Sequence, residues 1–437
     1  MSFASQYLPY LKTMDLGNSK NLIKMPNFGE VPNLEKLNLE GCVNLVQIDP
    51  SIGLLRKLVF LNLKNCKNLI SIPNSIFGLT SLKYLNLSRC SKVFNNPGVP
   101  RHLNKLDSSE IVLHSQSTTS SLYRNAHKGL VSRLLSSLLS FSFLWELDIS
   151  FCGLSQMPDA IGCIPLLGRL NLIGNNFVTL PSFRELSNLV YLELQHCKQL
   201  KFLPELPLPH SSPSIIKWDE YWKKWGLYIF NCPELGERDQ YSSMTLSWLI
   251  QFVQANQESL ACFRGTIDIV IPASEIPRWL NNQCVGKSIR IDLSPILHDS
   301  NFIGLACCVV FSVTFDDPTM TTKKLGPGMS LYFYCHTAKL QFMCPVIFYG
   351  DLITLESNHT WLIYVPRDSL SHRNKAFKDV DHITMTTCLE DGEGLHVDVN
   401  TCGYRYVFKQ DLEQFNSAVM HHRNPYAQKR KFLAIED

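Results

Sequence analysis

The residues that could perform chemistry in this chain do not assemble into a catalytic or metal-binding motif. Gly286-Lys287-Ser288 resembles the end of a phosphate-binding loop, but such a loop also needs an earlier glycine, and Asn281 stands at that position. Cys335-His336 lacks a third group that would orient a nucleophile and its base. The adjacent thiols Cys307-Cys308 would lie on opposite faces of a strand, so they cannot easily share a metal. No H-E-x-x-H, C-x-x-C or G-x-S-x-G sequence occurs. We therefore expect no catalytic residue, no cofactor, no metal site and no enzyme.

A repeated phrase of sequence instead predicts a regular surface. LEKLNLEGCVNLVQI, LVFLNLKNCKNLISI and LKYLNLSRCSKVF begin at Leu34, Leu58 and Leu82, 24 residues apart. Their apolar residues recur in register as L-x-x-L-x-L-x-x-C-x-x-L, with a slight departure at the end of the third copy. A fixed period of this length predicts a leucine-rich repeat, in which short coils stack in one dimension. Each L-x-x-L-x-L segment should form a short strand of a parallel sheet on the concave face of an arc.

The phrase occurs seven times, with an interruption in the middle. The four other copies begin at Leu11, Leu144, Leu167 and Leu189. Most copies end in a proline just after the last apolar residue, which predicts an extended turn rather than a long helix on the convex side. Residues 91–143 break the rhythm with a serine-rich loop and a predicted amphipathic helix around residues 130–139.

One position in each copy is predicted to close the turn after the strand. It lies three residues beyond the last strand leucine and is occupied by Ser19, Cys42, Cys66, Cys90, Cys152, Asn175 and Cys197. A small polar or thiol side chain there can satisfy backbone groups that the turn leaves unpaired. We expect a structural role for these cysteines.

The strand positions that face solvent form the candidate protein-binding surface. They are Lys36, Asn38, Phe60, Asn62, Tyr84, Asn86, Glu146, Asp148, Arg169, Asn171, Tyr191 and Glu193. The surface mixes aromatic rings with charges of both signs, a composition suited to protein contact. The alternative is that these are ordinary exposed strand positions without a partner.

The second half of the chain has a different pattern. From about Phe202 the leucine phrase gives way to PELPLPHSSPS, a proline- and serine-rich stretch that indicates a boundary, and Ser243–Gln254 is a predicted helix. Nine runs rich in β-branched and aromatic residues follow as predicted strands: Thr266–Ile271, Ser288–Leu293, Phe302–Phe315, Ser330–Cys335, Leu340–Phe348, Thr360–Val365, His382–Cys388, Leu395–Val399 and Gly403–Phe408. This spacing favours an antiparallel β-sandwich.

The predicted fold is thus an α/β leucine-rich-repeat solenoid followed by a mostly antiparallel, jelly-roll-like β-sandwich. The expected divisions are repeats over 1–210 with the irregular insertion at 91–143, a linker over 211–224, the sandwich over 225–415 and a basic tail over 416–437.

Composition and charge limit the classes of partner and the cellular compartment that we expect for this chain. The 437 residues are 45% hydrophobic and 18% charged with a net charge of +3, which demands neither a nucleic acid nor an anionic membrane. The N-terminal sequence has no secretory pattern, so we expect a cytoplasmic protein with reduced thiols. The longest apolar run, Phe302–Phe311, is too short to span a bilayer. Lys429-Arg430-Lys431 could also indicate nuclear import, but three basic residues in a row occur readily by chance, and we interpret this segment as a solvated tail.

The repeats over residues 41–90 closely resemble those of plant intracellular immune receptors of the TIR–NB-ARC–LRR class. Three later segments, IPASEIPRWLNNQCVGKSIRIDL, SNHTWLIYVPR and CGYRYVFKQD, resemble the landmarks P-x-S-E-I-P-x-W, H-x-W-L-x-Y and C-G-x-R-x-x-x-x-x-D of the post-repeat jelly-roll domain (C-JID) of those receptors. The landmark residues assigned to the sandwich by this resemblance are Ile276, Pro277, Trp279, Gly403 and Arg405. We expect Trp279 and Trp361 to be core aromatics first and contact residues second.

The resemblance implies that the repeats and the sandwich together recognise a pathogen effector protein. It also implies contacts with NB-ARC and TIR modules, within one chain or between chains. Neither module is visible here, so nucleotide switching and NAD cleavage are not expected of this chain, which resembles the sensing half as a truncated product or fragment. The alternative is a regulatory fragment or decoy that binds NB-ARC modules without sensing an effector itself. Residues 1–10 offer no evident cap, so the apolar end of the first coil is expected to be exposed unless an upstream segment covers it.

Overall fold

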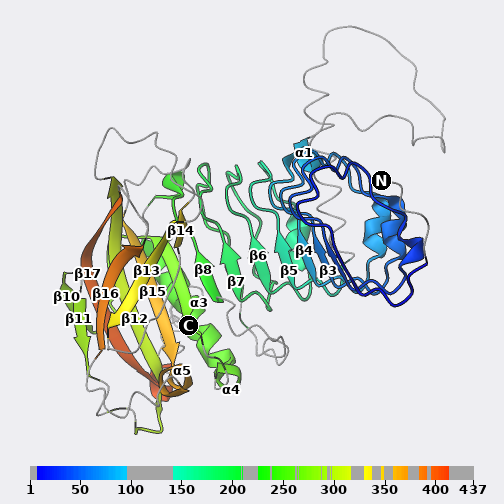
Figure 1. The fold of residues 1–437 in the computed structure, drawn as a ribbon. Helices are drawn as coiled ribbons and strands as arrows, with labels where there is room; N and C mark the ends of the chain where they lie inside the picture. The colour runs from blue at the N-terminus through cyan, green and yellow to red at the C-terminus, as the bar shows by residue number, and fades with distance from the viewer. Residues whose placement is uncertain are drawn as a thin grey trace, which may run out of the picture. The chain divides into compact units, whose positions relative to one another are not determined.

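The computed structural model describes residues 7–95, 141–207, 209, 225–236, 239–260, 263, 265–286, 288–292, 296, 298–315, 329–336, 346–348, 358–372, 383–390 and 395–412. The chain forms two compact units, one of residues 1–189 with 197–205 and one of residues 190–196 with 206–437 (Figure 1). The predicted helix around 130–139, the linker over 211–224 and the tail over 416–437 lie outside the described residues.

The first unit is a stack of coils, each of which contributes one strand of three residues to a parallel sheet (Figure 1). The strands are β1 (Thr13–Asp15), β2 (Lys36–Asn38), β3 (Phe60–Asn62), β4 (Tyr84–Asn86), β5 (Glu146–Asp148) and β6 (Arg169–Asn171). Neighbouring strands pair in register, so that equivalent residues of successive copies lie side by side, as Leu37, Leu61 and Leu85 do. The predicted solenoid and its parallel sheet are therefore confirmed.

The side of each described coil opposite the strand holds only short helical segments of three to five residues. It holds the 3-10 helices η1 (Phe28–Glu30), η2 (Pro50–Leu54), η3 (Asn74–Gly78) and η6 (Asp159–Cys163), and the short helix α1 (Ser91–Asn95). The side chains of Asn27 and Asp49 cap η1 and η2 by accepting backbone N–H bonds. A proline at or next to the first position, such as Pro50 or Pro73, fixes φ and supplies no N–H donor. The expected absence of long helices from this side is confirmed in the described coils.

The core of the first unit is a column of leucines. Leu34, Leu37 and Leu39 in the second coil are fully buried, and so are Leu58, Leu61 and Leu63 in the third. Burial of one such side chain contributes about 1.5–3 kcal/mol. Each coil depends on its neighbours for this burial, so the stack forms as a unit.

A ladder of side-chain hydrogen bonds runs along the turns that follow the strands. In each step a turn side chain donates to the carbonyl of the residue just after the strand of the preceding coil. The steps are Cys42 to Leu16 (3.1 Å), Cys66 to Leu39 (3.2 Å), Cys90 to Leu63 (3.1 Å), Cys152 to Leu87 (3.2 Å), Asn175 to Ile149 (3.0 Å) and Cys197 to Leu172 (3.5 Å). Burial raises the pKa of the Cys66 and Cys152 thiols to about 12, so both keep their protons at neutral pH. The structural role predicted for these cysteines is confirmed.

The residue just before each ladder position has a left-handed backbone. Asn18, Gly41, Asn65, Arg89, Phe151 and Gly174 have φ values between 53° and 71°. Glycine and asparagine adopt this conformation readily, whereas Arg89 and Phe151 do so at a steric cost. The guanidinium of Arg89 lies 4.3 Å from the ring centroid of Phe151, a cation–π contact that offsets part of that cost.

The described strands of the second unit form two sheets. In the first sheet the order is β7 (Tyr191–Glu193), β8 (Trp225–Tyr228), β9 (Ile267–Pro272), β15 (His359–Pro366), β12 (Phe302–Phe315), β17 (Leu395–Phe408) and β10 (Asn282–Val285). The second sheet consists of β11 (Ser288–Ile291), β16 (Ile383–Glu390), β13 (Met329–His336) and β14 (Val346–Phe348). Apart from β7, β8 and β9, which run parallel, all neighbours pair antiparallel. The predicted β-rich second domain is confirmed.

In the described part of this unit, the α-helices are α3 (Asp239–Ala255), α4 (Gln257–Leu260) and α5 (Arg367–His372), and η7 (Pro233–Leu235) is a 3-10 helix. Helix α3 contains the predicted helix Ser243–Gln254 and begins four residues earlier. Among the described residues no helix is both long and apolar enough to cross a membrane.

Two predicted strands, Leu395–Val399 and Gly403–Phe408, are halves of one strand, β17. The apparent break between them is a β-bulge. Val310 pairs with Thr401 and the next residue, Phe311, pairs with Val399, so Asn400 is the extra residue on β17. The chain bends there without leaving the sheet.

A further repeat coil begins at β8, beyond the point where the leucine phrase was expected to end. Strand β8 pairs in parallel with β7, and the Cys232 thiol donates to the Leu194 carbonyl at 3.0 Å, as in the ladder of the first unit. Asn231, just before it, has a φ of 53°. Strand β8 also pairs in parallel with β9, with Gly226 opposite Asp268. A Cβ on Gly226 would lie 1.7 Å from the Asp268 carbonyl oxygen, so only glycine fits.

The ladder predicts a large and specific cost for removing its amide step. Asn175 donates to the Ile149 and Leu172 carbonyls and accepts from the Leu154 N–H, all in a buried setting. Asn175→Ala should therefore lower the free energy of unfolding by about 2–3 kcal/mol. Asn175→Cys should lose about half as much, because the thiol can still donate to Ile149. Urea denaturation followed by circular dichroism gives these values. The exposed neighbour Asn176 supplies the control, and equal losses for Asn175→Ala and Asn176→Ala would contradict the ladder.

Candidate protein-binding surface

The predicted contact residues of the first unit occupy the two outward-facing positions of each strand. The outer column is formed by the first position and consists of Lys36, Phe60, Tyr84, Glu146 and Arg169. The asparagine column is formed by the last position and consists of Asn38, Asn62, Asn86, Asp148 and Asn171. The leucine between them points into the core and is buried. Tyr191 and Glu193 occupy the same two positions on β7, which belongs to the second unit.

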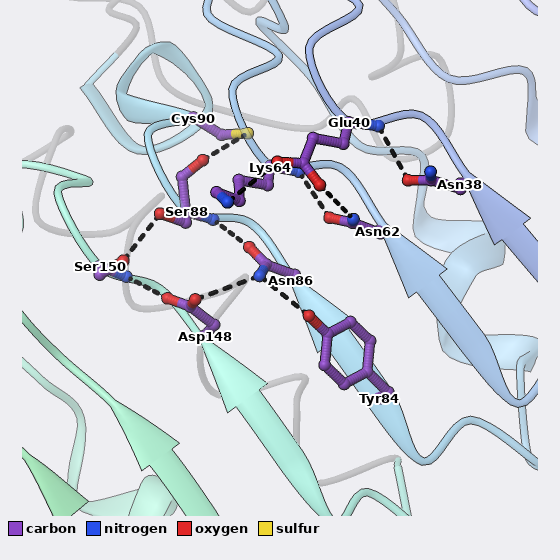
Figure 2. A network of polar contacts seen from close by, with 10 residues as sticks. All are labelled: Asn38, Glu40, Asn62, Lys64, Tyr84, Asn86, Ser88, Cys90, Asp148 and Ser150. Atoms are coloured by element: carbon purple, nitrogen blue, oxygen red, sulfur yellow. Dashed lines mark hydrogen bonds and ion pairs between the residues drawn. The ribbon is translucent and has the colours of Figure 1, made fainter. Parts of the chain in front are cut away.

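The asparagine column is engaged by the backbone of its own coil. Each side-chain Oδ1 accepts the backbone N–H of the residue two positions later, which makes an Asx turn where the strand ends. These bonds reach Asn38 from Glu40 (3.1 Å), Asn62 from Lys64 (3.0 Å), Asn86 from Ser88 (2.8 Å), Asp148 from Ser150 (3.0 Å) and Asn171 from Ile173 (3.1 Å). Figure 2 shows the first four of these turns.

The amide groups of this column also connect neighbouring coils. Asn62 Nδ2 donates to the Glu40 carboxylate at 3.1 Å, and Lys64 pairs with the same carboxylate at 2.9 Å (Figure 2). Asn86 Nδ2 donates to Asp148 Oδ2 at 3.1 Å. The exposed fractions of Asn62 and Asn86 are only 7% and 5%. These side chains therefore stabilise the sheet and offer little surface to a partner.

Asp148 is the carboxylate variant of this column. It accepts from the Ser150 N–H and from Asn86 Nδ2, and the hydroxyls of Ser88 and Ser150 share a hydrogen bond of 2.7 Å beside it (Figure 2). Burial raises the pKa of its carboxyl group, although the hydrogen bonds from Ser150 act in the opposite direction. A partly desolvated carboxylate thus lies at the strand end where β2, β3, β4 and β6 have an amide.

The outer column contains a preformed pair of aromatic rings. The rings of Phe60 and Tyr84 stack with 4.3 Å between centroids and 8° between planes. Both residues are half-buried, and Asn86 Nδ2 donates to the Tyr84 hydroxyl at 3.1 Å (Figure 2). Burial raises the pKa of Tyr84 to about 12, so the phenol stays neutral at physiological pH. Stacking and this hydrogen bond together hold the rings in one orientation.

Charged residues flank the aromatic pair within the first unit. Lys36 is exposed on the β2 side, next to Phe60 in the sheet register. On the other side, Arg169 Nε lies 3.5 Å from Glu146 Oε2 in a largely buried ion pair, and Glu146 is next to Tyr84 in the register. The column therefore presents a cation, two rings and a neutralised pair in sequence.

The two predicted residues on β7 are held by their own neighbours in the second unit. The Tyr191 hydroxyl donates to Glu193 Oε2 and Gln195 Nε2 donates to Glu193 Oε1, each at 2.5 Å. The rings of Tyr191 and Tyr228 approach to 5.5 Å between centroids. Glu193 is buried and Tyr191 is half-buried, so Tyr191 is the more accessible of the two.

The landmark residues of the sandwich meet in one cluster. Arg405 donates to the Trp279 carbonyl at 2.9 Å, its guanidinium lies 5.1 Å from the Trp279 ring centroid, and it pairs with Asp411 at 2.5 Å. A Cβ on Gly403 would lie 2.9 Å from the Asn282 carbonyl oxygen. The cluster therefore holds the segment that contains Trp279 against β17, which is a structural role.

The second predicted core aromatic, Trp361, is fully buried. Its Nε1 donates to Asp268 Oδ1 at 3.2 Å, and Tyr228 and Thr266 donate to Oδ2 of the same carboxylate. The core role expected for Trp361 is confirmed. Trp279 is half-buried beneath Arg405, so its ring is in part accessible.

Nothing in the described part of the chain provides a metal site, since no three His, Cys, Asp or Glu side chains there lie close enough to hold an ion. The outer column offers aromatic rings from which a partner can exclude water, with charged side chains beside them. Protein interfaces combine these two features. Sequence reasoning grouped the asparagine column with the contact residues. The signal that separates the two columns is the asparagine at the strand end, which is a residue type that favours an Asx turn.

Comparison with known proteins agrees with this architecture. Residues 271–413 match the C-JID domain. The chain is 33% identical over 224 residues to the disease resistance-like protein DSC1 of Arabidopsis thaliana, an alignment that covers 46% of this chain and 18% of the relative. It is 25% identical over 455 aligned positions to the disease resistance protein RPS4B of the same plant, covering 94% of this chain and 37% of the relative. This chain therefore spans well under half the length of both relatives.

The resemblance to plant disease resistance proteins is thus confirmed over much of the chain, with a C-JID domain after the repeats. Among solved structures, a leucine-rich-repeat protein of Leptospira interrogans aligns with 22% identity and a TM-score of 0.28, covering 53% of this chain and 55% of that one.

The raised pKa of Asp148 predicts a pH-dependent effect of Asp148→Asn. Because the folded state binds this proton more tightly than the unfolded state, Asp148 makes the wild type lose stability as the pH rises from about 4 towards 7. Asparagine keeps the oxygen that accepts the Ser150 N–H but cannot ionise. The free energy of unfolding of the variant, relative to wild type, should therefore increase over that range. Urea denaturation at both pH values tests this, with Asp159→Asn at an exposed position as the control. A relative stability that falls with rising pH would contradict the assignment.

Proposed function

We propose that this chain is the ligand-recognition part of a plant immune receptor and that it senses a pathogen protein through the outer column, together with the C-JID sandwich. The homology to disease resistance proteins and the C-JID match support a recognition region of such a receptor. The observation that carries the more specific proposal is the stacked Phe60–Tyr84 pair in the outer column.

The aromatic pair has the properties of a binding hot spot. Aromatic side chains contribute most at interfaces when they are fixed before binding, because less conformational entropy is then lost. Phe60 and Tyr84 are fixed by their mutual stacking and by the strands beneath them. The rings are half-buried, so a partner can cover the remaining surface and exclude water from it.

The charges around the pair favour a protein over a nucleic acid. Lys36 is the exposed cation of the outer column, whereas Arg169 is paired with Glu146. A nucleic acid site would need a cluster of unpaired basic side chains along the groove. A protein that places an apolar residue over the two rings and a carboxylate near Lys36 fits this surface better.

The proposed location is the cytoplasm. The ladder of the first unit consists mainly of reduced thiols that donate to backbone carbonyls, which is compatible with a reducing compartment. We propose no catalytic role for the chain, and interaction with NB-ARC or TIR modules of a receptor accompanies the recognition role.

Removal of the rings tests the proposal. The double substitution Phe60→Ala and Tyr84→Ala should weaken the complex with the recognised pathogen protein by about 1,000-fold, since two hot-spot side chains are worth about 2 kcal/mol each. Within the longest natural reading frame, the same variant should lose pathogen-triggered cell death in leaf tissue. Leu54→Ala is the matched control, because Leu54 is an apolar side chain 58% exposed on η2 and outside the strand face.

Unchanged recognition by the double variant would contradict the outer column as the binding surface. Co-purification of the chain with an NB-ARC module, unaffected by the double variant and without any pathogen protein, would instead favour a regulatory fragment.

A further inference from the structure

Two thiols of the sandwich face each other across a pair of strands. Cys284 on β10 and Cys402 on β17 are direct partners in the antiparallel register, and their Sγ atoms are 3.3 Å apart. Each sulfur also lies near a backbone carbonyl of the segment that follows β10: Cys284 is 3.5 Å from the Ser288 oxygen and Cys402 is 3.3 Å from the Gly286 oxygen. This pair is separate from the ladder thiols, which donate to carbonyls of the coil before.

The backbone geometry at this pair suits a disulfide. Directly opposed residues of an antiparallel pair have Cα atoms about 4.5 or 5.5 Å apart, and both values lie within the range of about 4.4–6.8 Å found for disulfides. The sulfurs need to approach only from 3.3 Å to about 2.05 Å. A rotation of the two side chains achieves this without separating the strands.

The pair lies where the chain passes from one sheet to the other. Strand β10 is the edge strand of the first sheet and pairs there with β17 alone, among the described strands. Gly286, with a φ of 114°, turns the chain, and β11 then pairs with β16 in the second sheet. A covalent bond between Cys284 and Cys402 would therefore fasten the edge strand and the corner of the sandwich.

The two thiols differ in access. Cys284 is partly exposed, whereas Cys402 is 1% exposed. Burial and the neighbouring Cys284 thiol raise the pKa of Cys402 to about 12, so the Cys402 thiol is protonated at neutral pH. This division suits a peroxide-sensitive pair with one attacking and one resolving thiol.

We propose that Cys284 and Cys402 form a redox-sensitive dithiol that peroxide converts into a disulfide across β10 and β17. The Cys284 thiolate attacks hydrogen peroxide, the O–O bond breaks, and hydroxide leaves to give the sulfenic acid and, after protonation, water. The Cys402 sulfur then attacks the Cys284 sulfur, and the S–O bond breaks. The Cys402 proton leaves with the hydroxide as a second water. A small dithiol reverses the bond by thiol–disulfide exchange.

The disulfide would close a long loop, from Cys284 to Cys402, and so restrict the unfolded chain strongly. Its formation depends only on the sandwich, so this proposal stands or fails independently of the binding role of the outer column.

Peroxide treatment of the full chain, followed by peptide mapping, tests the proposal. The reduced chain is exposed to hydrogen peroxide, alkylated and digested. The expected product is one linked peptide that contains both Cys284 and Cys402, lighter by two hydrogen atoms than its separate parts and released by dithiothreitol. The oxidised chain should melt at least about 5 °C higher than the reduced chain.

Variants sharpen this result. Cys284→Ser and Cys402→Ser should each abolish the linked peptide and the rise in melting temperature. Cys163→Ser, at an exposed cysteine of the first unit, should leave both unchanged. If a serine variant fails to fold, maleimide labelling of the wild type decides instead, because Cys284 should become protected after peroxide and reactive again after dithiothreitol. Sulfinic acid at Cys284 without a linked peptide, or a bond from either thiol to another cysteine, would overturn the proposal.

Discussion

The hydrogen bond from a turn side chain to the strand-end carbonyl of the preceding coil is the interaction on which the repeat structure depends. A coil of this length must leave the sheet within a few residues. The buried carbonyl just after each strand accepts one backbone N–H of its own coil, as Leu39 does from Cys42 at 3.1 Å, and its second lone pair needs another donor. The thiols of Cys66 and Cys90 meet this need with bonds of 3.2 and 3.1 Å. Each such bond contributes about 0.5–1.5 kcal/mol, and because the bonds recur from coil to coil, together they add to the stability of the stack. The left-handed residue just before each donor makes the turn tight enough for the bond to form.

This framework determines which surface of the first unit remains accessible. The asparagine column closes the same turns from the outward face and connects neighbouring coils, as Asn86 does with Asp148. The side chains of the outer column do not close the turns in this way. Phe60 and Tyr84 are held there by their mutual stacking and by the pleat of the sheet. A rigid sheet with a preformed aromatic pair loses little entropy when it binds, which suits recognition. The last position of each three-residue strand therefore closes the turn, and the first position is the one proposed to contact a partner.

The sequence predicted the features that recur at a fixed spacing. It did not predict the features that depend on contacts between distant parts of the chain. The leucine period predicted each described strand of the first unit, and the cysteine position predicted the ladder, because both depend on local spacing. The left-handed conformations at Arg89 and Phe151 were not predicted, since neither residue type favours them. The coil at Trp225–Leu235 was missed because only Leu227 keeps a leucine of the repeat motif, while Lys224 and Ile229 stand where the first and last strand leucines would be. Strand β10 was missed because Asn282–Val285 is largely polar and is held by pairing with β17.

The contrast between the two faces of the first unit can be measured directly by site-specific photo-cross-linking. A photoreactive phenylalanine analogue is placed at Phe60 in one sample and at Leu54 on η2 in another, in chains exposed to extracts of infected tissue. The division of roles described above predicts an adduct with a pathogen-encoded protein at position 60 and none at position 54. Adducts with pathogen proteins at position 54 alone, or with receptor modules alone at position 60, would contradict it.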